Sequence, residues 1–373
     1  MRIVVNTRLL RKDRLDGIGW FAFNTLKLIV EKNPQVEFHF LFDSGIESEF
    51  LFGENVIGHN LFPPAKHAML NILWSEVFVK RKLRYLNPDL YYSPDGMLCL
   101  GWNGKQHGVI HDLNFMHYPE HLKWTNRKYY RSFFPQFAKK ATRIATVSEY
   151  SKIDIVKSFG ISPDKIDVVY CGINSFLRPL SEEEKYQVRE KFTDSKPFFL
   201  FVGTLSPRKN VIGLLKAYDL FKNLSQSDIK LVVVGGGMYK TEETHAFLES
   251  MTYRKDVLFT GRLADDDLRN IYGAALALTY LPYFEGFGIP LIEAMQTEIP
   301  IISSNVTSLP EVTGDAALLV NPNNTEEIID AMSEISSNEN LRNEMIAKGK
   351  RRKEIFSWQR TSDLLWQSIS HCL

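Results

Sequence analysis

The sequence is organised around Tyr280-Leu-Pro-Tyr-Phe-Glu-Gly-Phe-Gly-Ile-Pro-Leu-Ile-Glu-Ala-Met295, where the features of a strand, a glycine loop and a helix follow one another. The apolar run over residues 274–281 predicts a buried parallel strand. Gly286 and Gly288 allow close backbone approach, and Pro290 suits the first residue of a helix. The loop is therefore expected to end at a helix N-terminus, whose unpaired N–H groups and partial positive charge bind phosphate.

Two carboxylates bracket this loop. Glu285 opens it, and Glu293 is expected in the first helical turn, with its side chain leaning back toward the helix start. An ionised carboxylate accepts two hydroxyl hydrogen bonds at once, so the pair suits vicinal hydroxyls on either side of a phosphate, as in a sugar nucleotide. The alternative is that Glu293 complements the helix dipole, that Glu285 is solvated and that the glycines only close a turn.

The run Glu285-Gly-Phe-Gly-Ile-Pro-Leu-Ile-Glu-Ala-Met295 resembles the signature of the retaining glycosyltransferases of family four, and residues 309–322 also resemble that family's pattern. The resemblance implies an α/β chain with the GT-B fold: two facing Rossmann-like domains, a deep inter-domain cleft, and a last helix that crosses back to the first domain. The sequence departs from the family at Gln296-Thr-Glu298, where a small residue and a glycine are usual. Glu298 therefore argues against an ordinary left-handed helix termination.

Length and composition agree with a two-domain globular protein. The chain has 373 residues, of which 44% are hydrophobic and 24% charged. No apolar run has the length of a membrane span, and the first residues resemble a strand more than a signal peptide. Cys99, Cys171 and Cys372 are odd in number and have no ligand-like spacing, which favours a reducing cytoplasm and argues against structural zinc.

Charge divides the chain unevenly. Residues 1–175 carry a net charge of +6 and seven of the nine histidines, and the remainder carries −5, so the two parts are expected to face different partners. The polar stretch 177–196 predicts an inter-domain connection with one short helix. We therefore expect an acceptor-binding domain over residues 1–176, a nucleotide-sugar-binding domain over 177–355, and a returning helix over 356–373.

Two places in the first domain are candidate binding sites. Gly17 and Gly19 follow an initial strand and precede a helix expected from about residue 20, and the family resemblance implies that this loop lies near donor phosphates and acceptor. A glycine needed only for the turn is the alternative. His111 and Asp112 end the apolar strand at 108–114, where ligands of open α/β sheets gather. The resemblance implies that His111 lies beside the transferred sugar; a structural histidine is the alternative.

In the second domain, Arg208 and Lys209 precede a helix that Asn210 is expected to cap. Adjacent cations at a strand-to-helix junction can neutralise a diphosphate, and these match the family's phosphate-binding arginine and lysine; solvated bases are the alternative. The strand at 230–237 ends in glycines that admit a nucleotide close to the backbone. Together with Glu293, the donor-binding residues that the resemblance implies are Gly17, Gly19, Gly203, Gly235, Arg262, Leu263, Gly286, Phe287, Gly288, Ile289, Pro290 and Leu291.

Two other segments allow competing interpretations. Asp265-Asp-Asp267 resembles a metal-binding Asp-x-Asp, but a helical pattern follows it, so we interpret the run as a helix N-cap with first-turn acids and predict no metal. Residues 119–143 interleave bases with aromatic side chains. Such a segment can lie on an anionic membrane and gather a lipid-linked acceptor, or it can be a helix with aromatics in the core and bases in water.

Together with these features, the family resemblance implies a retaining, metal-independent hexosyltransferase with His111, Arg208, Lys209 and Glu285 as its catalytic residues and Glu293 holding the ribose. The donor is a nucleotide-diphosphate sugar, with mannose favoured, and the acceptor is a saccharide or lipid-linked saccharide in polysaccharide or glycoconjugate assembly. We expect no cofactor, no nucleic acid partner, and a cytoplasmic location at the inner face of the membrane. The alternatives are a sugar-nucleotide epimerase, a phosphorylase on the same architecture, or a non-catalytic nucleotide-sugar-binding protein.

Overall fold

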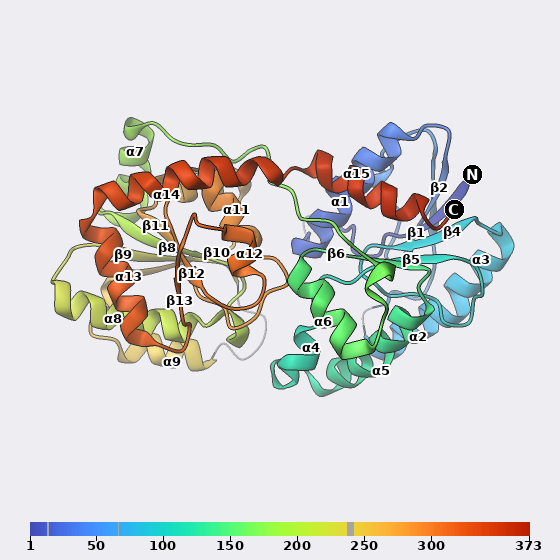
Figure 1. Cartoon of the computed structure of the whole chain (residues 1–373), viewed down its shortest axis with the longest axis horizontal. Helices are drawn as coiled ribbons and strands as arrows, with labels where there is room; N and C mark the ends of the chain where they lie inside the picture. The colour runs from blue at the N-terminus through green and yellow to red at the C-terminus, as the bar shows by residue number, and fades with distance from the viewer. Residues whose placement is uncertain (13–14, 66, 237–241) are drawn as a thin grey trace. The chain divides into compact units, whose positions relative to one another are not determined.

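The computed structural model describes residues 1–12, 15–65, 67–236 and 242–373. These residues form two α/β units, Met1–Gly172 with Ser357–Leu373, and Ile173–Phe356 (Figure 1). The chain passes from one unit to the other after residues 172 and 356, where the sequence suggested 176 and 355. No helix in the described ranges is long and apolar enough to span a bilayer.

The first unit is built on a seven-stranded parallel sheet in the order β3-β2-β1-β4-β5-β6-β7. Its strands are β1 (Arg2–Asn6), β2 (Glu37–Phe42), β3 (Val56–Asn60), β4 (Leu90–Ser93), β5 (Gln106–Val109), β6 (Arg143–Thr146) and β7 (Ile166–Val168). The sequence did not predict β3, because an edge strand buries little: of its residues only Val56 is buried. The strand order reverses at β1 and β4, so the carboxyl ends of these strands flank a topological switch point.

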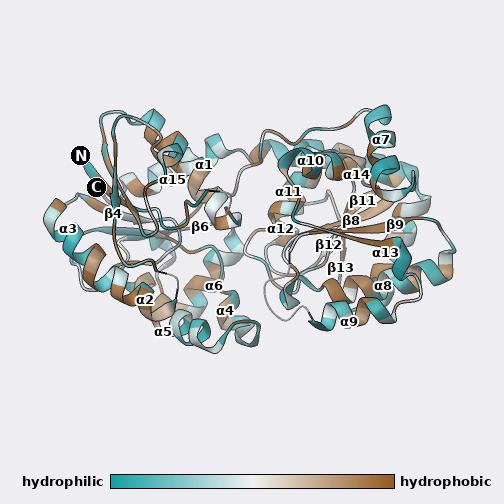
Figure 2. Cartoon of the chain, turned by 180° about the vertical axis from the view of Figure 1, so that it is seen from behind, coloured by the Kyte–Doolittle hydropathy of each residue, from teal (hydrophilic) through white to brown (hydrophobic). Residues whose placement is uncertain are grey.

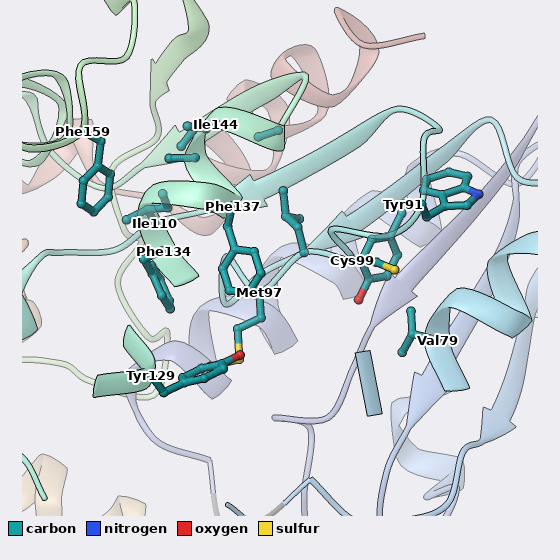
Figure 3. Packing of buried hydrophobic residues seen from close by; sticks show 14 of the residues in the cluster. Val79, Tyr91, Met97, Cys99, Ile110, Tyr129, Phe134, Phe137, Ile144 and Phe159 are labelled. Atoms are coloured by element: carbon teal, nitrogen blue, oxygen red, sulfur yellow. The ribbon is translucent and has the colours of Figure 1, made fainter. Parts of the chain in front are cut away.

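The helices of this unit are α1 (Gly17–Lys32), α2 (Ala68–Leu73), the π-helical η2 (Trp74–Val79), α3 (Lys80–Leu86), α4 (Asn114–His117), α5 (Trp124–Lys140), α6 (Glu149–Phe159) and α15 (Trp358–Ser370). Single 3-10 turns lie at η1 (Ser48–Phe50), η3 (Pro119–His121) and η4 (Pro163–Lys165). Figure 3 shows Tyr129, Phe134 and Phe137 of α5 packed in the core beside Met97 and Ile110. Three of the six aromatic residues in the basic segment 119–143 are thus buried, two more pack against the core, and its bases are exposed or half-buried.

The C-terminal helix α15 belongs to this first unit and packs against α1 (Figure 1). Its start passes so close to Gly172 that a Cβ there would lie 2.2 Å from the Trp358 nitrogen. Thr361 donates to the Tyr170 carbonyl at 2.7 Å, and Ser368 donates to Asp167 at 2.6 Å. The end of the chain therefore completes the fold of its beginning.

The second unit has a six-stranded parallel sheet in the order β10-β9-β8-β11-β12-β13. Its strands are β8 (Phe198–Val202), β9 (Lys230–Val234), β10 (Val257–Gly261), β11 (Ala277–Tyr280), β12 (Ile301–Ser304) and β13 (Leu318–Val320). Its helices are α7 (Glu182–Thr193), α8 (Val211–Ser225), α9 (Glu242–Ser250), α10 (Asp265–Ala274), α11 (Ile289–Gln296), α12 (Leu309–Thr313), α13 (Thr325–Ser337) and α14 (Glu339–Arg352), with 3-10 turns η5 (Pro207–Lys209), η6 (Arg254–Asp256) and η7 (Lys353–Ile355). Figure 2 shows its central strands as strongly hydrophobic, which is what burial on both faces requires.

Residues 177–196, predicted as a connection, contribute a packed helix to the second unit. Helix α7 begins with a capping box between Ser181 and Glu184 and packs against α10. Arg189 also donates to the Ala274 carbonyl at 3.0 Å. The polar composition of α7 arises because only one narrow face of this helix is buried.

The expectation about Glu298 was wrong. Glu298 itself adopts the left-handed conformation, with φ +59°, after α11. The Ile299 N–H then bonds to the Ala294 carbonyl at 3.1 Å, and Lys350 pairs with the Glu298 carboxylate at 2.7 Å. Helix α11 therefore ends with the usual left-handed residue although that residue is not glycine, and the ion pair with Lys350 fixes the Glu298 side chain.

Candidate functional site

The loops after β8 and β11 bring three charged side chains together at the carboxyl edge of the second sheet. Arg208 Nη1 lies 2.5 Å from Glu285 Oε1, and Lys209 Nζ bonds to the same oxygen. Lys209 also donates to the Tyr280 hydroxyl at 2.5 Å. Because β8 and β11 are paired neighbours, Lys209 and Arg208 meet Glu285 at one point, although they precede it in the sequence by 76 and 77 positions.

The backbone fixes this charged cluster of Arg208, Lys209 and Glu285. Arg208 donates to the Phe284 carbonyl at 2.9 Å, and its own carbonyl accepts from the Tyr283 N–H at 2.8 Å. Ser308, from the loop after β12, donates to the Glu285 carbonyl at 2.9 Å. Three neighbouring strand ends therefore hold the cluster, which is a pre-organised arrangement.

Charge and burial decide what the cluster can bind. Burial alone would raise the pKa of Glu285, but Arg208 and then Lys209 outweigh burial and hold that pKa below its ordinary value. Lys209 and Glu285 are both buried, which excludes the alternative of solvated charges. One carboxylate against two cations leaves a net positive charge, so the cluster suits an anion while Glu285 remains an acceptor for hydroxyl groups.

Glu293 lies farther along α11 than expected. It is the fifth residue of that helix, in the second turn, and the first turn contains no acid. Its side chain is buried, and Oε2 accepts from the Tyr272 hydroxyl of α10 at 2.7 Å. Burial raises the pKa of Glu293 to about 7. It is therefore a buried group close to its titration midpoint at neutral pH, and the helix-dipole interpretation is excluded.

In the first unit, His111 follows β5 by two residues, as the strand-end pattern predicted. Its ring bonds through Nε2 to the Pro94 carbonyl at 2.8 Å and meets the Phe21 ring at a centroid distance of 4.9 Å. Burial lowers the pKa of His111, so the ring is neutral. A neutral ring that donates from Nε2 has Nδ1 as its acceptor nitrogen. Asp112, by contrast, accepts from the Asn114 N–H at 2.9 Å and shapes the start of α4.

The loop that holds the Pro94 carbonyl contains residues that the sequence interpretation missed. Asp95 pairs with Arg8 at 2.6 Å and accepts from Asn6 and Ser93 at 3.0 and 2.7 Å. These groups lie at the carboxyl ends of β1 and β4, the switch point of the first sheet. The strand-end rule that located His111 could have located Asp95 as well.

Comparison with known proteins identifies the family. The model described as Glycosyltransferase Family 4 matches residues 15–175, and the model described as Glycosyl transferases group 1 matches residues 182–352. The chain belongs to glycosyltransferase family 4. It therefore has the GT-B fold that this family shares.

Two relatives of this family member are mannosyltransferases by name. It is 31% identical to O-antigen chain mannosyltransferase B of Escherichia coli over 252 residues, which cover 67% of this chain and 66% of that protein. It is 28% identical to O-antigen chain mannosyltransferase RfbU of Salmonella typhimurium over 239 residues, which cover 61% of this chain and 63% of that protein. The match thus spans slightly less than two thirds of each relative.

Solved structures agree in fold. A sucrose-phosphate synthase from Thermosynechococcus elongatus has a TM-score of 0.81 and 16% identity, with 100% of this chain and 98% of that chain covered. The Anabaena protein HepE in complex with UDP-glucose has a TM-score of 0.77 and 16% identity, with 100% of both chains covered.

The glycines that the family resemblance singled out have specific packing roles here. Gly288 has φ +96°, and a Cβ there would lie 2.8 Å from Leu309. Gly235 has φ +136°, and its Cβ would lie 1.9 Å from the Gly203 carbonyl oxygen. Gly235 is therefore required by the close approach of two strand-end turns. Gly237, at the end of the predicted glycine run, lies outside the described residues.

Other predicted residues lie around the cluster at different distances. Ile289 begins α11 and Pro290 is its second residue, one position later than expected. The Phe287 ring meets the Phe356 ring at 5.6 Å. Arg262 and Leu263 follow β10, which lies two strands from β8 and three from β11 in the same sheet.

The helix starts of both units differ from the predictions. Gly17 and Gly19 lie in the first turn of α1, which begins earlier than residue 20, and Asp16 caps it by accepting from the Gly19 N–H at 2.9 Å. Asn210 occupies the N-cap position of α8 in a left-handed conformation, but its side chain donates to the Pro322 carbonyl at 2.9 Å and does not cap the helix.

The acidic run Asp265, Asp266 and Asp267 forms the first turn of α10, as predicted, but the N-cap expected within the run is instead Ala264. Asp266 pairs with Arg269 and Asp267 with Lys191. Across the described ranges, no group of three or more His, Cys, Asp or Glu side chains is placed to hold a metal ion. Metal independence stays a prediction.

Proposed function

We propose that this protein is a retaining, metal-independent hexosyltransferase that uses a nucleotide-diphosphate sugar as donor. The observation that carries the proposal is the buried cluster in which Arg208 and Lys209 share one oxygen of Glu285. Two cations fixed at strand ends can stabilise the charge that develops on a departing diphosphate. The second oxygen of Glu285 can accept hydroxyls of the transferred sugar.

Other residues extend this donor site. Glu293 is proposed to hold the ribose, because a buried carboxylate gains two hydrogen bonds from a vicinal diol. Arg262 and Leu263 are proposed to contact the base, since they follow β10 at the same carboxyl edge of the sheet as the charged cluster, two strands from β8. From the first unit, we propose that the acceptor nitrogen of His111 bonds to a sugar hydroxyl.

Retention is proposed to follow from front-face attack, in which the departing diphosphate helps to deprotonate the acceptor hydroxyl. In this scheme the protein supplies charge stabilisation, and it needs no covalent intermediate. The two O-antigen chain mannosyltransferase relatives support mannose as the sugar and polysaccharide assembly as the process. The acceptor is proposed to be a saccharide or a lipid-linked saccharide. The same proposal places the protein in the cytoplasm at the inner face of the membrane.

The first test is thermal unfolding with UDP-, GDP- and ADP-sugars in the presence of a chelator. A ligand at a hundredfold excess over its Kd should stabilise the fold by about 2.7 kcal/mol. The second test is incubation of the stabilising donor with mannoside acceptors, with NMR of the anomeric centre in the product. Retention of configuration without metal supports the proposal, whereas inversion or a metal requirement contradicts it.

The same experiment separates the alternative functions. A free sugar nucleotide interconverted without an acceptor would indicate an epimerase. Donor binding without turnover for any acceptor would indicate a non-catalytic binding protein. In both cases the assignment of the donor site would stand, and the proposed glycosyl transfer would be refuted.

A further inference from the structure

Helix 68–86 of the first unit carries an apolar row on its outer side. Segments α2, η2 and α3 form this one continuous helix, because the residues at both junctions have helical backbone angles. Every fourth residue from Met69 is exposed: Met69 by 82%, Leu73 by 42%, Val77 by 49% and Tyr85 by 80%, with exposed Arg81 between the last two. The opposite side is apolar too, since Trp74, Val79, Leu83 and Leu86 are core residues (Figure 3 labels Val79).

The π-helical segment helps to keep this row on one side. In an α-helix of 3.6 residues per turn, a spacing of four drifts around the axis by about 40° at each step. The wider turn of η2, over Trp74–Val79, counteracts that drift in the middle of the row. Met69, Leu73 and Val77 therefore form a row about 12 Å long on a surface that faces water.

The charges on the same helix are one-sided. Arg81 and Arg84 are exposed and extend the row. Glu76 is the only acid in the sequence between residues 62 and 88. Its two oxygens accept from the Leu100 and Gly101 N–H groups at 2.7 and 2.8 Å, so its charge is directed inward. The outer side is consequently apolar at one end and cationic at the other.

The neighbouring helix α5 begins with an exposed aromatic side chain. Helix α5 packs against α2, and its first residue, Trp124, is 62% exposed. Lys128 Nζ lies 5.4 Å from the centre of the Trp124 ring. Tryptophan next to a cation is typical of the interface between lipid and water.

We propose that the outer side of helix 68–86 docks on an anionic lipid bilayer. Met69, Leu73 and Val77 enter the headgroup region, and Arg81 and Arg84 contact anionic headgroups. A bilayer suits a single convex row of separated apolar side chains with bases at one end, because it needs no matching groove. The basic-aromatic pattern of residues 119–143 suggested α5 as the membrane-binding segment, whereas this proposal assigns membrane binding to helix 68–86. This proposal does not depend on which sugar is transferred.

The test is flotation of the full-length protein with phosphatidylcholine vesicles that contain either no anionic lipid or roughly one third phosphatidylglycerol. Wild type should float only with the anionic vesicles, and less at high salt. The variant Met69→Gln/Leu73→Gln/Val77→Gln should bind at least tenfold more weakly. Its control is Leu220→Gln/Leu224→Gln, which changes exposed leucines on α8 and should bind like wild type.

A second pair of variants distinguishes the contributions of the basic helices α3 and α5 to vesicle binding. Each Lys or Arg at an anionic surface contributes roughly fivefold in binding, so Arg81→Glu/Arg84→Glu should lower it roughly 25-fold or more. Arg131→Glu/Lys139→Glu makes the same charge change on α5 and should have a smaller effect. All variants should keep the donor-induced thermal shift, which distinguishes loss of docking from loss of the fold or of the donor site.

Several outcomes would overturn the proposal. Wild type that fails to float with anionic vesicles rejects bilayer docking. Equal losses in the α3 and α5 charge variants, or a loss in the α8 control, reject this surface. A dimer in light scattering that the triple glutamine variant abolishes, without vesicle binding by wild type, would assign the row to a second copy of the chain instead.

Discussion

Replacing Glu293 by glutamine should make the protein more stable in alkaline solution and weaken its donor binding. The carboxyl of Glu293 has a pKa of about 7 in the fold, against an ordinary value of 4.5, because it is buried. Between these values the unfolded chain ionises and the folded one stays protonated, so wild type loses stability as pH rises. At about 1.36 kcal/mol per pH unit, the loss reaches about 3 kcal/mol above pH 7.

The glutamine variant does not titrate, and its amide oxygen can still accept from the Tyr272 hydroxyl. The free energy of unfolding of the variant minus that of wild type should therefore be about 3 kcal/mol larger near pH 8 than near pH 4. For a unit of this size, that corresponds to a rise in melting temperature of about 6–10 °C. Ligand-free calorimetry of both proteins at several pH values measures the gap.

Parallel stability profiles with no gap opening between pH 4 and pH 8 would refute a protonated Glu293 in the ligand-free fold. Donor titration provides the second readout. If the ribose hydroxyls bind the ionised form, wild type should bind donor more tightly above pH 7 and release a proton on binding. A variant that binds donor as tightly as wild type would refute the ribose role.

Glu285→Gln should act in the opposite direction, because the pKa of Glu285 is depressed. Loss of the carboxylate leaves Arg208 and Lys209 without their shared anion and should lower the free energy of unfolding by about 3 kcal/mol at neutral pH. The difference from wild type should fade in acid, as Glu285 of the wild type becomes protonated. Calorimetry that shows the variant unchanged near neutral pH would contradict this. Arg208→Ala should lower kcat by on the order of 10², and steady-state kinetics with wild-type kcat would remove its leaving-group role. Gly235→Ala should destabilise the second unit by about 3 kcal/mol through its left-handed φ and its clash with Gly203, whereas Gly236→Ala, which meets nothing within 4 Å, should be neutral in the same unfolding assay.

Local patterns were sufficient for the central elements. The strand before Glu285 is buried on both faces, so its residues are apolar in an unbroken run, and glycine and proline mark the turn that follows. The same logic located His111 at a strand end. It failed for β3, whose edge position leaves little apolar signal. It predicted a short helix within residues 177–196 but assigned that stretch to an inter-domain connection, because the buried face of α7 is narrow.

Contacts between distant segments could not be predicted in the same way. The sequence placed Arg208 and Lys209 at one strand end and Glu285 at another, but the shared oxygen depends on the pairing of β8 with β11. Tyr272 and Tyr280 carry no local mark of their roles. They became visible only as partners of Glu293 and Lys209.

The sequence by itself determined the order of strands, glycine turns and helices, together with the family and the residue types at the strand ends. These are properties of short segments, set by backbone sterics and by the period of apolar residues. The tertiary structure decided which charges meet, which of them ionise and which apolar side chains stay exposed. Those properties depend on how much water the rest of the chain removes from each group, because burial penalises an ionised side chain and favours an apolar one.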